Sequence, residues 1–402
     1  MMKDQQIICI SSTTWFGYYT KSTVQLLERL AASNQVLFIE YPHTWKDIVT
    51  TLLKKQQGAQ VARMLGLGKR LQRITTASST QVFNLVVPPT LPVYFLKNEK
   101  LFNWLFRINS TVYLRSVRKA ARALGFERPI VIAAFNPFYG NALLGKLNEK
   151  AHIYYCYDAV ESWFYGERIF ATEEQYIRKV DGVITTSDQL YREKSGLNPR
   201  CVTVKNGVDF QLFAPHARRA IVQRERKKIG YIGSLDHRFD IDLVEFVIRR
   251  SPGLDFEFTG ALLNEAVKTR LSGYPNVRFF EPVDSAKVPA LLASYDAGMI
   301  PYLRNEANKN IYPLKINEYL AVGVPLVMTN FAGLPEFDTM VSTADNEEEF
   351  LKLLQHEINS DSLAKVTDRI NFAKKNSWEA RTEEFGQALI RLTGLHNTRE
   401  CD

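Results

Sequence analysis

The stretch NIYPLKINEYLAVGVPLVMTNF, residues 310–331, is the part of the chain that decides its fold. Pro313 stands near the start of a helix predicted over 314–322, and Gly323 stands just past its end. Proline favours the first helical turn and glycine the position after the last, so these two residues delimit the helix. The apolar residues 325–328 then predict a buried strand. A short helix that runs directly into a buried strand is typical of α/β sheets.

Two polar residues lie on this helix, Lys315 and Glu318, and positions three apart share one helix face. Backbone N–H groups at a helix start, here from Leu314 onward, favour phosphate, and a lysine beside them adds a full positive charge. A carboxylate one turn on can accept two hydrogen bonds from a ribose diol. The motif therefore predicts a clamp for a nucleoside diphosphate that is built without metal. The alternative is an ordinary helix whose lysine and glutamate are solvated.

Outward from this stretch, apolar strands alternate with helices along both halves of the chain. In the first half, strands are predicted over 7–10, 36–40, 130–134, 153–156, 183–186 and 202–204. In the second half, they are predicted over 229–232, 255–259, 277–280 and 297–301. Strand–helix–strand order implies parallel sheets with right-handed crossovers, so each half is predicted to be a doubly wound α/β domain.

A break in this alternation predicts where the domains divide. Residues 210–226 lose periodicity and contain Pro215, so we interpret them as a linker. It would join a first domain over 1–209 to a second domain over 227–376. The final segment, 377–402, is predicted to hold a helix that returns to the first domain.

The bulk composition excludes several classes of protein. Hydrophobic residues make up 46% of the 402, enough for two cores, and no apolar run is long enough to span a bilayer. No signal peptide is recognisable, because only four apolar residues follow MMKDQQ. The six histidines lack metal-site spacing, and no CxxC pair occurs among Cys9, Cys156, Cys201 and Cys401. We therefore expect a protein of the reducing cytoplasm, soluble or peripheral to the membrane, without metal or other cofactor.

Positive charge is concentrated in the first half of the chain. The net charge is +8, but residues 1–150 carry 20 Lys and Arg against 7 Asp and Glu, and residues 46–128 carry 15 against 3. Helical spacing is fair over 45–73 and clear over 100–124. The apolar face of the second helix is predicted to hold Leu101, Leu105, Ile108 and Val112. A basic helix with aromatic residues can lie on an anionic membrane, and the alternative is that it only covers a core.

A polar and aromatic loop, residues 11–19, follows the first predicted strand. Sheets of this kind bind ligands at the loops after the carboxyl ends of their strands. Trp15, Gly17 and Tyr18 are therefore candidates for contact with the substrate. The alternative for Trp15 and for Phe16 is simple packing.

These candidates lie in phrases that resemble a known family. In the second half the phrases are KKIGYIGSLDHRFDIDLV (227–244), NVRFFEPVDSAKVPALLASYDAGMIPYL (276–303) and PLKINEYLAVGVPLV (313–327). In the first half NQVLFIEYP, VDGVITTSDQLY and VKNGVDFQLF also match. Together they resemble the GT-B glycosyltransferases that use nucleotide-sugar donors, near glycosyltransferase family four. The likeness is nearest to teichuronic-acid glycosyltransferases of bacterial surface polysaccharides, and more remote to the xanthan glucuronosyltransferase.

The resemblance implies two Rossmann-like domains that face a central cleft, a UDP-sugar donor and a lipid-linked acceptor at the inner face of the membrane. It also implies that Lys315 holds the UDP diphosphate and Glu318 the ribose. Many members have a further glutamate eight positions before the latter, where this chain has Asn310. This departure leaves open both the identity of the sugar and the choice between retention and inversion; the xanthan-type branch, which inverts, also lacks that glutamate.

Strand ends in the second half supply further candidates for the donor nucleotide. Gly233 and Ser234 follow a predicted strand, where glycine lets the backbone approach a phosphate, and the alternative is a plain turn. Tyr302 ends another strand and is a candidate for contact with the base or the diphosphate. Glu281 is a candidate for the uracil edge. A structural role is the alternative for both.

Asp158 is the candidate catalytic base. It follows the strand predicted over 153–156, and an inverting transfer needs a base that takes the proton of the attacking hydroxyl. Burial among neighbouring aromatic residues is expected to raise its pKa. The alternatives are a helix cap or a structural hydrogen-bond acceptor, and Glu161 is the second candidate for the base.

Three further interpretations compete with this one. The sequence Asp240-Ile241-Asp242 resembles the DxD motif that binds Mn²⁺ in the other large glycosyltransferase fold, but we expect Asp240 to cap a helix and Asp242 to favour its dipole. No metal site is therefore predicted. A sugar-nucleotide epimerase of the same fold is the alternative enzyme. A nucleic-acid binder would fit the basic half, but no motif for such a role is found.

Overall fold

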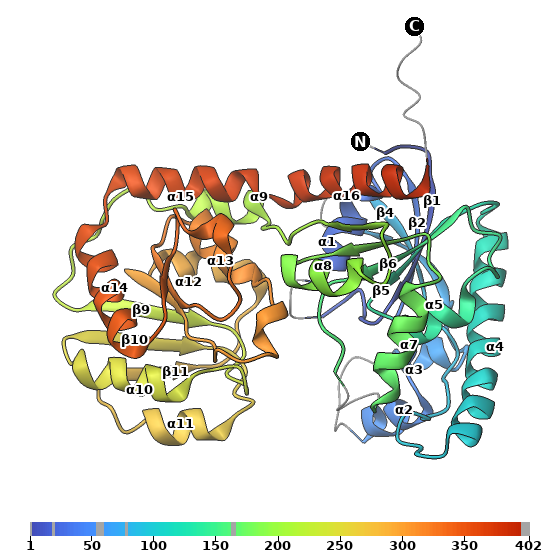
Figure 1. Ribbon diagram of the computed structural model, residues 1–402, viewed down its shortest axis with the longest axis horizontal. Helices are drawn as coiled ribbons and strands as arrows, with labels where there is room; N and C mark the ends of the chain where they lie inside the picture. The colour runs from blue at the N-terminus through green and yellow to red at the C-terminus, as the bar shows by residue number, and fades with distance from the viewer. Residues whose placement is uncertain (1, 18–20, 54–59, 77–78, 162–165, 395–402) are drawn as a thin grey trace, which may run out of the picture. The chain divides into compact units, whose positions relative to one another are not determined.

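The computed structural model describes residues 2–17, 21–53, 60–76, 79–161 and 166–394 (Figure 1). The chain divides into two compact units. The first unit comprises Met1–Lys205 and Thr382–Asp402, and the second comprises Asn206–Arg381. Among the described residues, no helix has both the length and the apolar character needed to cross a bilayer.

The first unit is built on an eight-stranded sheet with the order β3-β4-β2-β1-β5-β6-β7-β8. Its strands are β1 (Gln6–Ser11), β2 (Gln35–Ile39), β3 (Leu71–Thr75), β4 (Gln81–Leu85), β5 (Ile130–Ala134), β6 (Ala151–Cys156), β7 (Gly182–Thr185) and β8 (Cys201–Thr203). All neighbouring strands are parallel except β3 and β4, which pair antiparallel. The parallel sheet predicted for this half is therefore confirmed, and two strands that were not predicted, the parallel β4 and the antiparallel β3, extend it at one edge.

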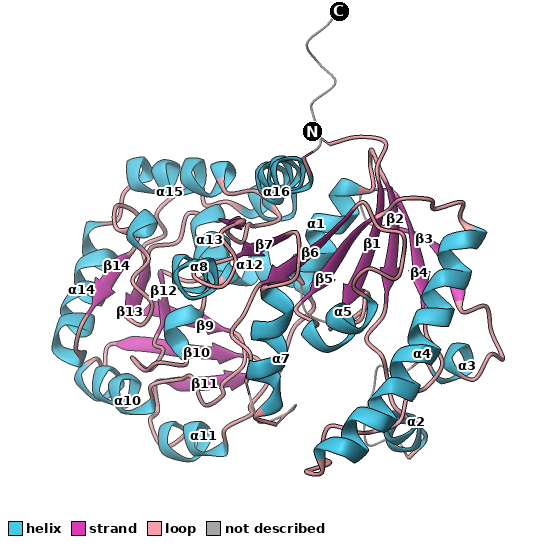
Figure 2. Ribbon diagram, turned by 45° about the vertical axis from the view of Figure 1, so that its right-hand side comes forward, coloured by secondary structure: helices cyan, strands magenta, loops and turns pink. Residues whose placement is uncertain are grey.

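Helices cover both faces of this sheet (Figure 2). They are α1 (Ser22–Leu30), α2 (Trp45–Leu52), α3 (Val61–Met64), α4 (Glu99–Ala123), α5 (Pro137–Leu143), α7 (Arg168–Ile177), α8 (Asp188–Ser195) and the greater part of α16 (Trp378–Thr393). Side chains alternate across a strand, so Tyr154 and Tyr155 of β6 point to opposite faces. Tyr154 packs edge-to-face with Tyr176 of α7, and Tyr155 packs edge-to-face with Phe385 of α16.

The second unit holds a six-stranded parallel sheet with the order β11-β10-β9-β12-β13-β14. Its strands are β9 (Lys227–Ile232), β10 (Leu254–Thr259), β11 (Val277–Phe280), β12 (Ala297–Ile300), β13 (Leu326–Thr329) and β14 (Ser342–Ala344). Its helices are α9 (Phe210–Phe213), α10 (Ile241–Arg250), α11 (Glu265–Leu271), α12 (Val288–Ala293), α13 (Leu314–Ala321), α14 (Glu347–Ser360) and α15 (Leu363–Lys375). Counted from β9, the strands follow the doubly wound order 3-2-1-4-5-6.

The strand order of each sheet reverses at one point. In the second unit the reversal lies between β9 and β12, and in the first unit it lies between β1 and β5. Connections leave on opposite faces at such a point, so a crevice opens outside the carboxyl ends of the two strands. Ligands of each unit are therefore expected at the loops that follow these strands.

The segment between α1 and α4 differs from its prediction. Residues 45–73 have fair helical spacing, but the described residues of this segment form two short helices, α2 and α3, and then enter β3. Strand β3 pairs with β4 over Leu71–Thr75 and has a half-buried or exposed side chain at each position. Its short, polar sequence carries little strand signal. Its pairing with β4, and not its own residues, decides its conformation.

The predicted linker is also different in the structure. Residues 210–226 belong to the second unit, which begins at Asn206. Phe213 lies in the buried core of that unit, and Arg218 forms an ion pair with Asp361 at 3.2 Å. The loss of periodicity therefore reflects irregular packing and not a free connection. At the end of the chain, the residues from Thr382 onward are grouped with the first unit.

Helix α4 has nearly the predicted length, but it buries a different face. The buried residues are Phe102, Asn109, Tyr113, Val117, Ala120 and Ala121. Leu101 and Ile108, which were expected on the core face, are 43% and 40% exposed, and Trp104 is 61% exposed. The helix carries two apolar stripes, and spacing alone does not tell which of them meets the sheet.

Candidate functional site

The second unit brings three predicted residues together where its strand order reverses. Gly233 follows β9 directly, and Tyr302 lies two residues beyond the end of β12. Helix α13 begins at Leu314 and carries Lys315 in its first turn. The Lys315 Nζ donates a hydrogen bond to the Tyr302 hydroxyl at 2.9 Å. Segments that are far apart in the sequence therefore meet at one positively charged position.

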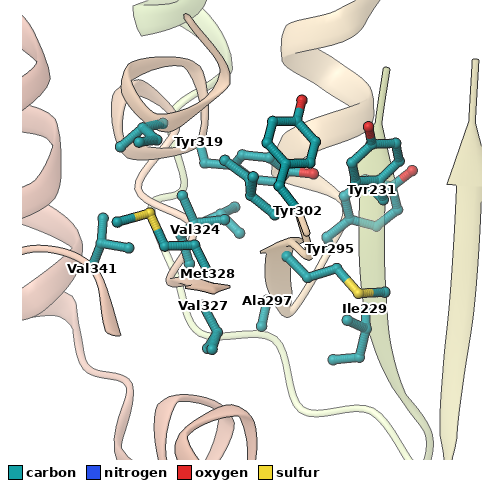
Figure 3. Close-up of a cluster of buried hydrophobic side chains, with 14 of the residues drawn as sticks. Ile229, Tyr231, Tyr295, Ala297, Tyr302, Tyr319, Val324, Val327, Met328 and Val341 are labelled. Atoms are coloured by element: carbon teal, nitrogen blue, oxygen red, sulfur yellow. The ribbon is translucent and has the colours of Figure 1, made fainter. Parts of the chain in front are cut away.

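Aromatic rings surround the ammonium group of Lys315. Its Nζ lies 5.4 Å from the centre of the Tyr231 ring and 5.5 Å from that of Tyr302, within the range of cation–π attraction. Both rings belong to the buried cluster of this unit (Figure 3). The pKa of the Tyr302 phenol is lowered: burial opposes its ionisation, but the charges of Lys315 and Arg238 and the hydrogen bonds from Lys315 and Tyr231 together outweigh burial.

Glycine is required at two positions beside this lysine. Gly233 has φ +145°, and a Cβ there would lie 2.2 Å from the Lys315 Cε. Gly260, after β10, has φ +149°, and its Cβ would lie 2.0 Å from the Gly233 carbonyl oxygen. Ser234, the residue after Gly233, accepts a hydrogen bond from the Tyr231 hydroxyl on its carbonyl oxygen at 2.8 Å. The strand end is thus shaped so that the lysine passes directly over the backbone.

Glu318 lies one turn further along α13 and is half-buried. Burial raises its pKa to about 6, and the positive charge of Lys315 only partly opposes this rise. In the described part of the chain, its carboxylate has neither a hydrogen bond nor an ion pair of its own. A carboxylate in this state gains most from a ligand that supplies hydrogen-bond donors.

The start of α13 offers further hydrogen-bond donors. Pro313 is the N-cap residue, and no side chain caps the helix. The first backbone N–H groups, from Leu314 onward, therefore remain available to an anion at the positive end of the helix.

The sequence-based prediction missed Arg238, in the loop between β9 and α10. Its Nε donates to Asp236 Oδ1 at 3.0 Å, and its guanidinium carbon lies 5.6 Å from the centre of the Tyr302 ring. It is a second cation at the same reversal point as Lys315. The signal that could have found it is a basic residue in the loop directly after the first strand of a doubly wound unit.

Two further positions from the sequence analysis, the donor candidate Glu281 and the family departure Asn310, lie apart from this cluster of contacts. Glu281 is exposed after β11, so β10 separates its strand from that of Gly233. Asn310, where the family has a glutamate, is half-buried shortly before α13. Its Oδ1 is buried and has no hydrogen-bond partner among the described residues.

The DxD-like sequence has structural partners. The Asp240 carboxylate accepts the backbone N–H of Leu243 at 3.0 Å, which confirms the predicted helix cap. Asp242 Oδ1 accepts a hydrogen bond from Arg270 Nη1 at 2.6 Å. Over the residues that the structure describes, no group of three or more His, Cys, Asp or Glu side chains is arranged to hold a metal ion.

In the first unit, Asp158 lies two residues beyond the end of β6 and is exposed. The expected burial is therefore wrong, because the strand ends at Cys156 and the chain then enters an open loop. Asp158 Oδ1 accepts the backbone N–H of Ala159 at 2.9 Å. Glu161, the second candidate for the base, is exposed as well.

The loop after β1 holds the remaining candidates. Trp15 is buried and packs edge-to-face on Phe38 with ring centres 5.0 Å apart, as the packing alternative predicts. Phe16, in contrast, is 56% exposed. Gly17 has φ +150°, and a Cβ there would lie 3.1 Å from the Lys21 Nζ. Tyr18 lies outside the described residues.

Comparisons with known proteins agree with this arrangement. Residues 226–360, from the first strand of the second unit through α14, match the family described as Glycosyl transferases group 1. A Bacillus subtilis protein named for teichuronic acid biosynthesis, the glycosyltransferase TuaH, is 30% identical over 172 residues. That similarity spans 40% of this chain and 43% of the relative.

Solved structures resemble the chain along nearly its whole length. Sucrose-phosphate synthase from Thermosynechococcus elongatus has a TM-score of 0.68 at 14% identity, with 98% of this chain and 100% of that chain covered. An Escherichia coli trehalose-6-phosphate structure bound with UDP-2-fluoro glucose has a TM-score of 0.68 at 11% identity, with 97% and 100% covered. The predicted GT-B fold with two Rossmann-like units is thereby confirmed. The predicted resemblance to GT-B glycosyltransferases is confirmed as well.

Proposed function

We propose that this protein is a glycosyltransferase that moves a sugar from a UDP-sugar to a hydroxyl group of a saccharide acceptor. The observation that carries the proposal is the half-buried Glu318 carboxylate, whose pKa is raised to about 6, one turn after Lys315. A ribose diol supplies two donors to such a carboxylate, and the lysine meets the adjoining diphosphate. The match to the glycosyl transferases group 1 family supports transfer, and the ligand of the E. coli structure supports a UDP-sugar.

The diphosphate would bind at the uncapped start of α13. Lys315 and the backbone N–H groups there would neutralise the negative charge of the diphosphate, and Arg238 adds a second cation at the same reversal point. Gly233 has no side chain, so the phosphate can approach the backbone at the strand end. These groups stabilise the leaving diphosphate electrostatically. We therefore propose that transfer needs no divalent cation.

The first unit would present the attacking alcohol. Its oxygen forms a bond to the anomeric carbon, the bond from that carbon to the diphosphate oxygen breaks, and UDP leaves with the electron pair. In an inverting transfer Asp158 takes the hydroxyl proton, and its exposure leaves it open to an acceptor. Asn310, in place of a glutamate, is consistent with inversion.

We further propose that the acceptor is lipid-linked and that the first unit meets it at an anionic membrane. The name of the B. subtilis relative supports a surface polysaccharide as the product. Two exposed apolar stripes of the first unit support the membrane. They comprise Trp45, Val49 and Leu52 on α2 and Leu101, Trp104 and Ile108 on α4, and we call them the docking face.

The two stripes of the docking face lie close together. The Trp45 backbone N–H donates to the Thr90 carbonyl oxygen at 3.0 Å, and the adjacent Leu91 is bonded through its N–H to Asn109 of α4 at 2.8 Å. In both ribbon views α2 lies beside one end of α4 (Figures 1 and 2). The segment that carries most of this face, 46–128, holds 15 basic against 3 acidic residues, and tryptophans together with positive charge suit an anionic bilayer surface.

A combined binding and transfer assay tests the proposed activity. UDP is expected to raise the unfolding temperature of the protein, and GDP-mannose and ADP-glucose to raise it less. With one UDP-sugar and a membrane lipid extract, UDP and a glycosylated lipid should appear in equal amounts, with or without EDTA. Turnover that stops in EDTA and returns with Mn²⁺ would contradict the site. Conversion of the UDP-sugar without acceptor, and without release of UDP, would instead indicate an epimerase.

A further inference from the structure

Two charged side chains from outside the β1 loop, residues 11–17, bond to its backbone. The Glu40 carboxylate is 1% exposed directly after β2, and its Oε2 accepts the backbone N–H of Trp15 at 2.9 Å. From another side, Lys21 Nζ donates to the Phe16 carbonyl oxygen at 2.7 Å. A buried anion and a partly buried cation thus fix neighbouring residues of the loop.

The other carboxylate oxygen of Glu40 is bonded to a residue outside the loop. Asn84, on β4, donates to Glu40 Oε1 through Nδ2 at 2.6 Å. The side-chain oxygen of Asn84 accepts from Arg63 Nη1 at 2.9 Å, and its backbone oxygen accepts from Nη2 at 3.0 Å. All three residues are buried, so a guanidinium reaches a carboxylate through a single asparagine inside the unit.

Arg63 also holds the exposed turn that follows α3. Its Nη2 donates to the Arg70 carbonyl oxygen at 2.7 Å, and its Nε donates to that of Lys69 at 3.1 Å. The turn carries Leu65 and Leu67, which are 41% and 81% exposed. A continuous chain of hydrogen bonds therefore runs from an exposed apolar turn to the β1 loop.

Burial disfavours the charged forms of Glu40, Lys21 and Arg63. Burial raises the pKa of Glu40, although the charges of Lys21 and Arg63 and its own hydrogen bonds oppose the rise. Burial likewise lowers the pKa of Lys21 and of Arg63. An apolar residue in place of a buried ionic group is often at least as stable. What an apolar residue would not supply is an acceptor for the Trp15 N–H, and with it the shape of the loop.

We propose that Glu40 is the positioning residue of the β1 loop, and that Asn84 and Arg63 make the shape of this loop depend on the exposed turn after α3. The inference rests on the proposed function, and it adds that the β1 loop meets the acceptor and that the exposed turn after α3 also meets the membrane. Lipid contact at Leu67 restrains Arg63, and the restraint passes through the asparagine and the carboxylate to the loop. Membrane binding thereby orders the loop at which the lipid-linked acceptor arrives.

A second buried carboxylate of the same unit provides a matched control. Glu173, on α7, is 3% exposed and pairs directly with Lys194 at 2.8 Å. The Tyr154 hydroxyl donates to its other oxygen at 2.7 Å. Loss of its charge should disturb the unit to a similar degree without touching the chain of bonds to the β1 loop.

Hydrogen exchange of the β1 loop tests the proposal without a known acceptor. In Asn84→Leu, a nearly isosteric change, we expect amides in 11–17 to exchange about tenfold faster, the factor for one lost buried hydrogen bond. Glu173→Gln should leave exchange in 11–17 as in the wild type. Vesicles of phosphatidylglycerol and phosphatidylcholine should slow this exchange in the wild type but not in Asn84→Leu, although both proteins bind the vesicles equally. A merely structural asparagine would not change the response to vesicles.

Two results would overturn the proposal: unchanged exchange at 11–17 in Asn84→Leu, or an equal response to vesicles in both proteins. If Asn84→Leu does not fold, Arg63→Gln, nearer the surface, breaks the same chain and must give the same result. Vesicles that do not bind the wild type would overturn the link to lipid. Calorimetry with UDP separates that outcome from a failure of the donor site, because UDP should bind all variants equally.

Discussion

The two points at which strand order reverses are built in different ways. In the second unit the site is made from the backbone and its immediate neighbours: two glycines, the start of α13 and one lysine between buried tyrosines. In the first unit the corresponding loop is bonded by two charged side chains, Glu40 and Lys21, and Glu40 is bonded in turn, through Asn84, to Arg63. Under the proposed function, the difference means that the diphosphate would be met by fixed backbone and one lysine, whereas the acceptor would meet a loop whose shape depends on buried polar side chains.

The largest effect is expected from Lys315→Ala, which breaks the donor side of this comparison. Loss of a charge-assisted contact to phosphate costs about 2–3 kcal/mol, so UDP affinity should fall roughly 30- to 150-fold. Isothermal titration calorimetry measures it directly. Lys309→Ala, which removes an exposed lysine paired with Glu306, is the control and should bind UDP as the wild type does. Equal affinity in both variants would show that the diphosphate binds elsewhere.

A smaller but double effect is expected from Gly233→Ala. The added Cβ would meet the Lys315 stem at a backbone angle that side chains rarely adopt, so we expect a loss of about 1–3 kcal/mol in unfolding free energy and weaker UDP binding. Urea denaturation and calorimetry measure the two losses. Gly253→Ala serves as control, because a Cβ there meets open space. A Gly233→Ala protein with normal stability and affinity would contradict the close packing of lysine on backbone.

The docking face sharpens the comparison from the other side. In Trp45→Ser combined with Trp104→Ser, loss of two exposed aromatic side chains should weaken binding to phosphatidylglycerol vesicles about tenfold or more. Vesicle co-sedimentation at low and high salt measures it, and UDP affinity should be unaffected. The control Leu363→Ser removes an exposed apolar residue of the second unit. Equal loss in the control would mean that no particular face meets the lipid.

The smallest effect concerns the titration of Glu318. Its pKa is raised to about 6 in the folded protein, so between its usual value and 6 the folded state holds a proton that the unfolded state has released. Stability conferred by this site should therefore fall as pH rises through that window. At pH 7.5 the unfolding free energy of Glu318→Gln should exceed that of the wild type by roughly 1–2 kcal/mol, so the variant should unfold at a higher temperature. Calorimetric unfolding at several pH values measures the difference.

The same carboxylate must be ionised to accept both ribose hydroxyls. Affinity for UDP-glucose, whose phosphates do not titrate in this range, should rise a few-fold as pH rises from about 5 to 7.5, since the ionised form binds better. In Glu318→Gln the affinity should be lower and nearly independent of pH. A wild-type affinity that does not change with pH would contradict the proposed contact between Glu318 and the ribose.

Much of the fold could be predicted from the sequence, because its signals are local. The helix predicted over 314–322 agrees with α13, and the strands predicted over 130–134 and 277–280 have the bounds of β5 and β11. The prediction for residues 45–73 was wrong because β3 is defined by its pairing with β4 and not by its own residues. Which stripe of α4 is buried likewise depends on the packing partner.

The site was predictable only as far as sequence neighbours reach. Lys315 and Glu318 share one helix turn, so their spacing indicated their joint role in the prediction. The proximity of Lys315 to Gly233 and of Glu40 to Asn84 arises from strand order, which no local pattern contains. The burial expected of Asp158 was wrong for the same reason, since the end of a buried strand does not show where the following loop goes.

The most direct test of the central claim is the hydrogen-exchange footprint of UDP on the wild-type protein. The account predicts slower exchange confined to the end of β9 and its loop, residues 231–238, and to the start of α13, residues 313–319. Slower exchange elsewhere, with these two segments unchanged, would contradict it.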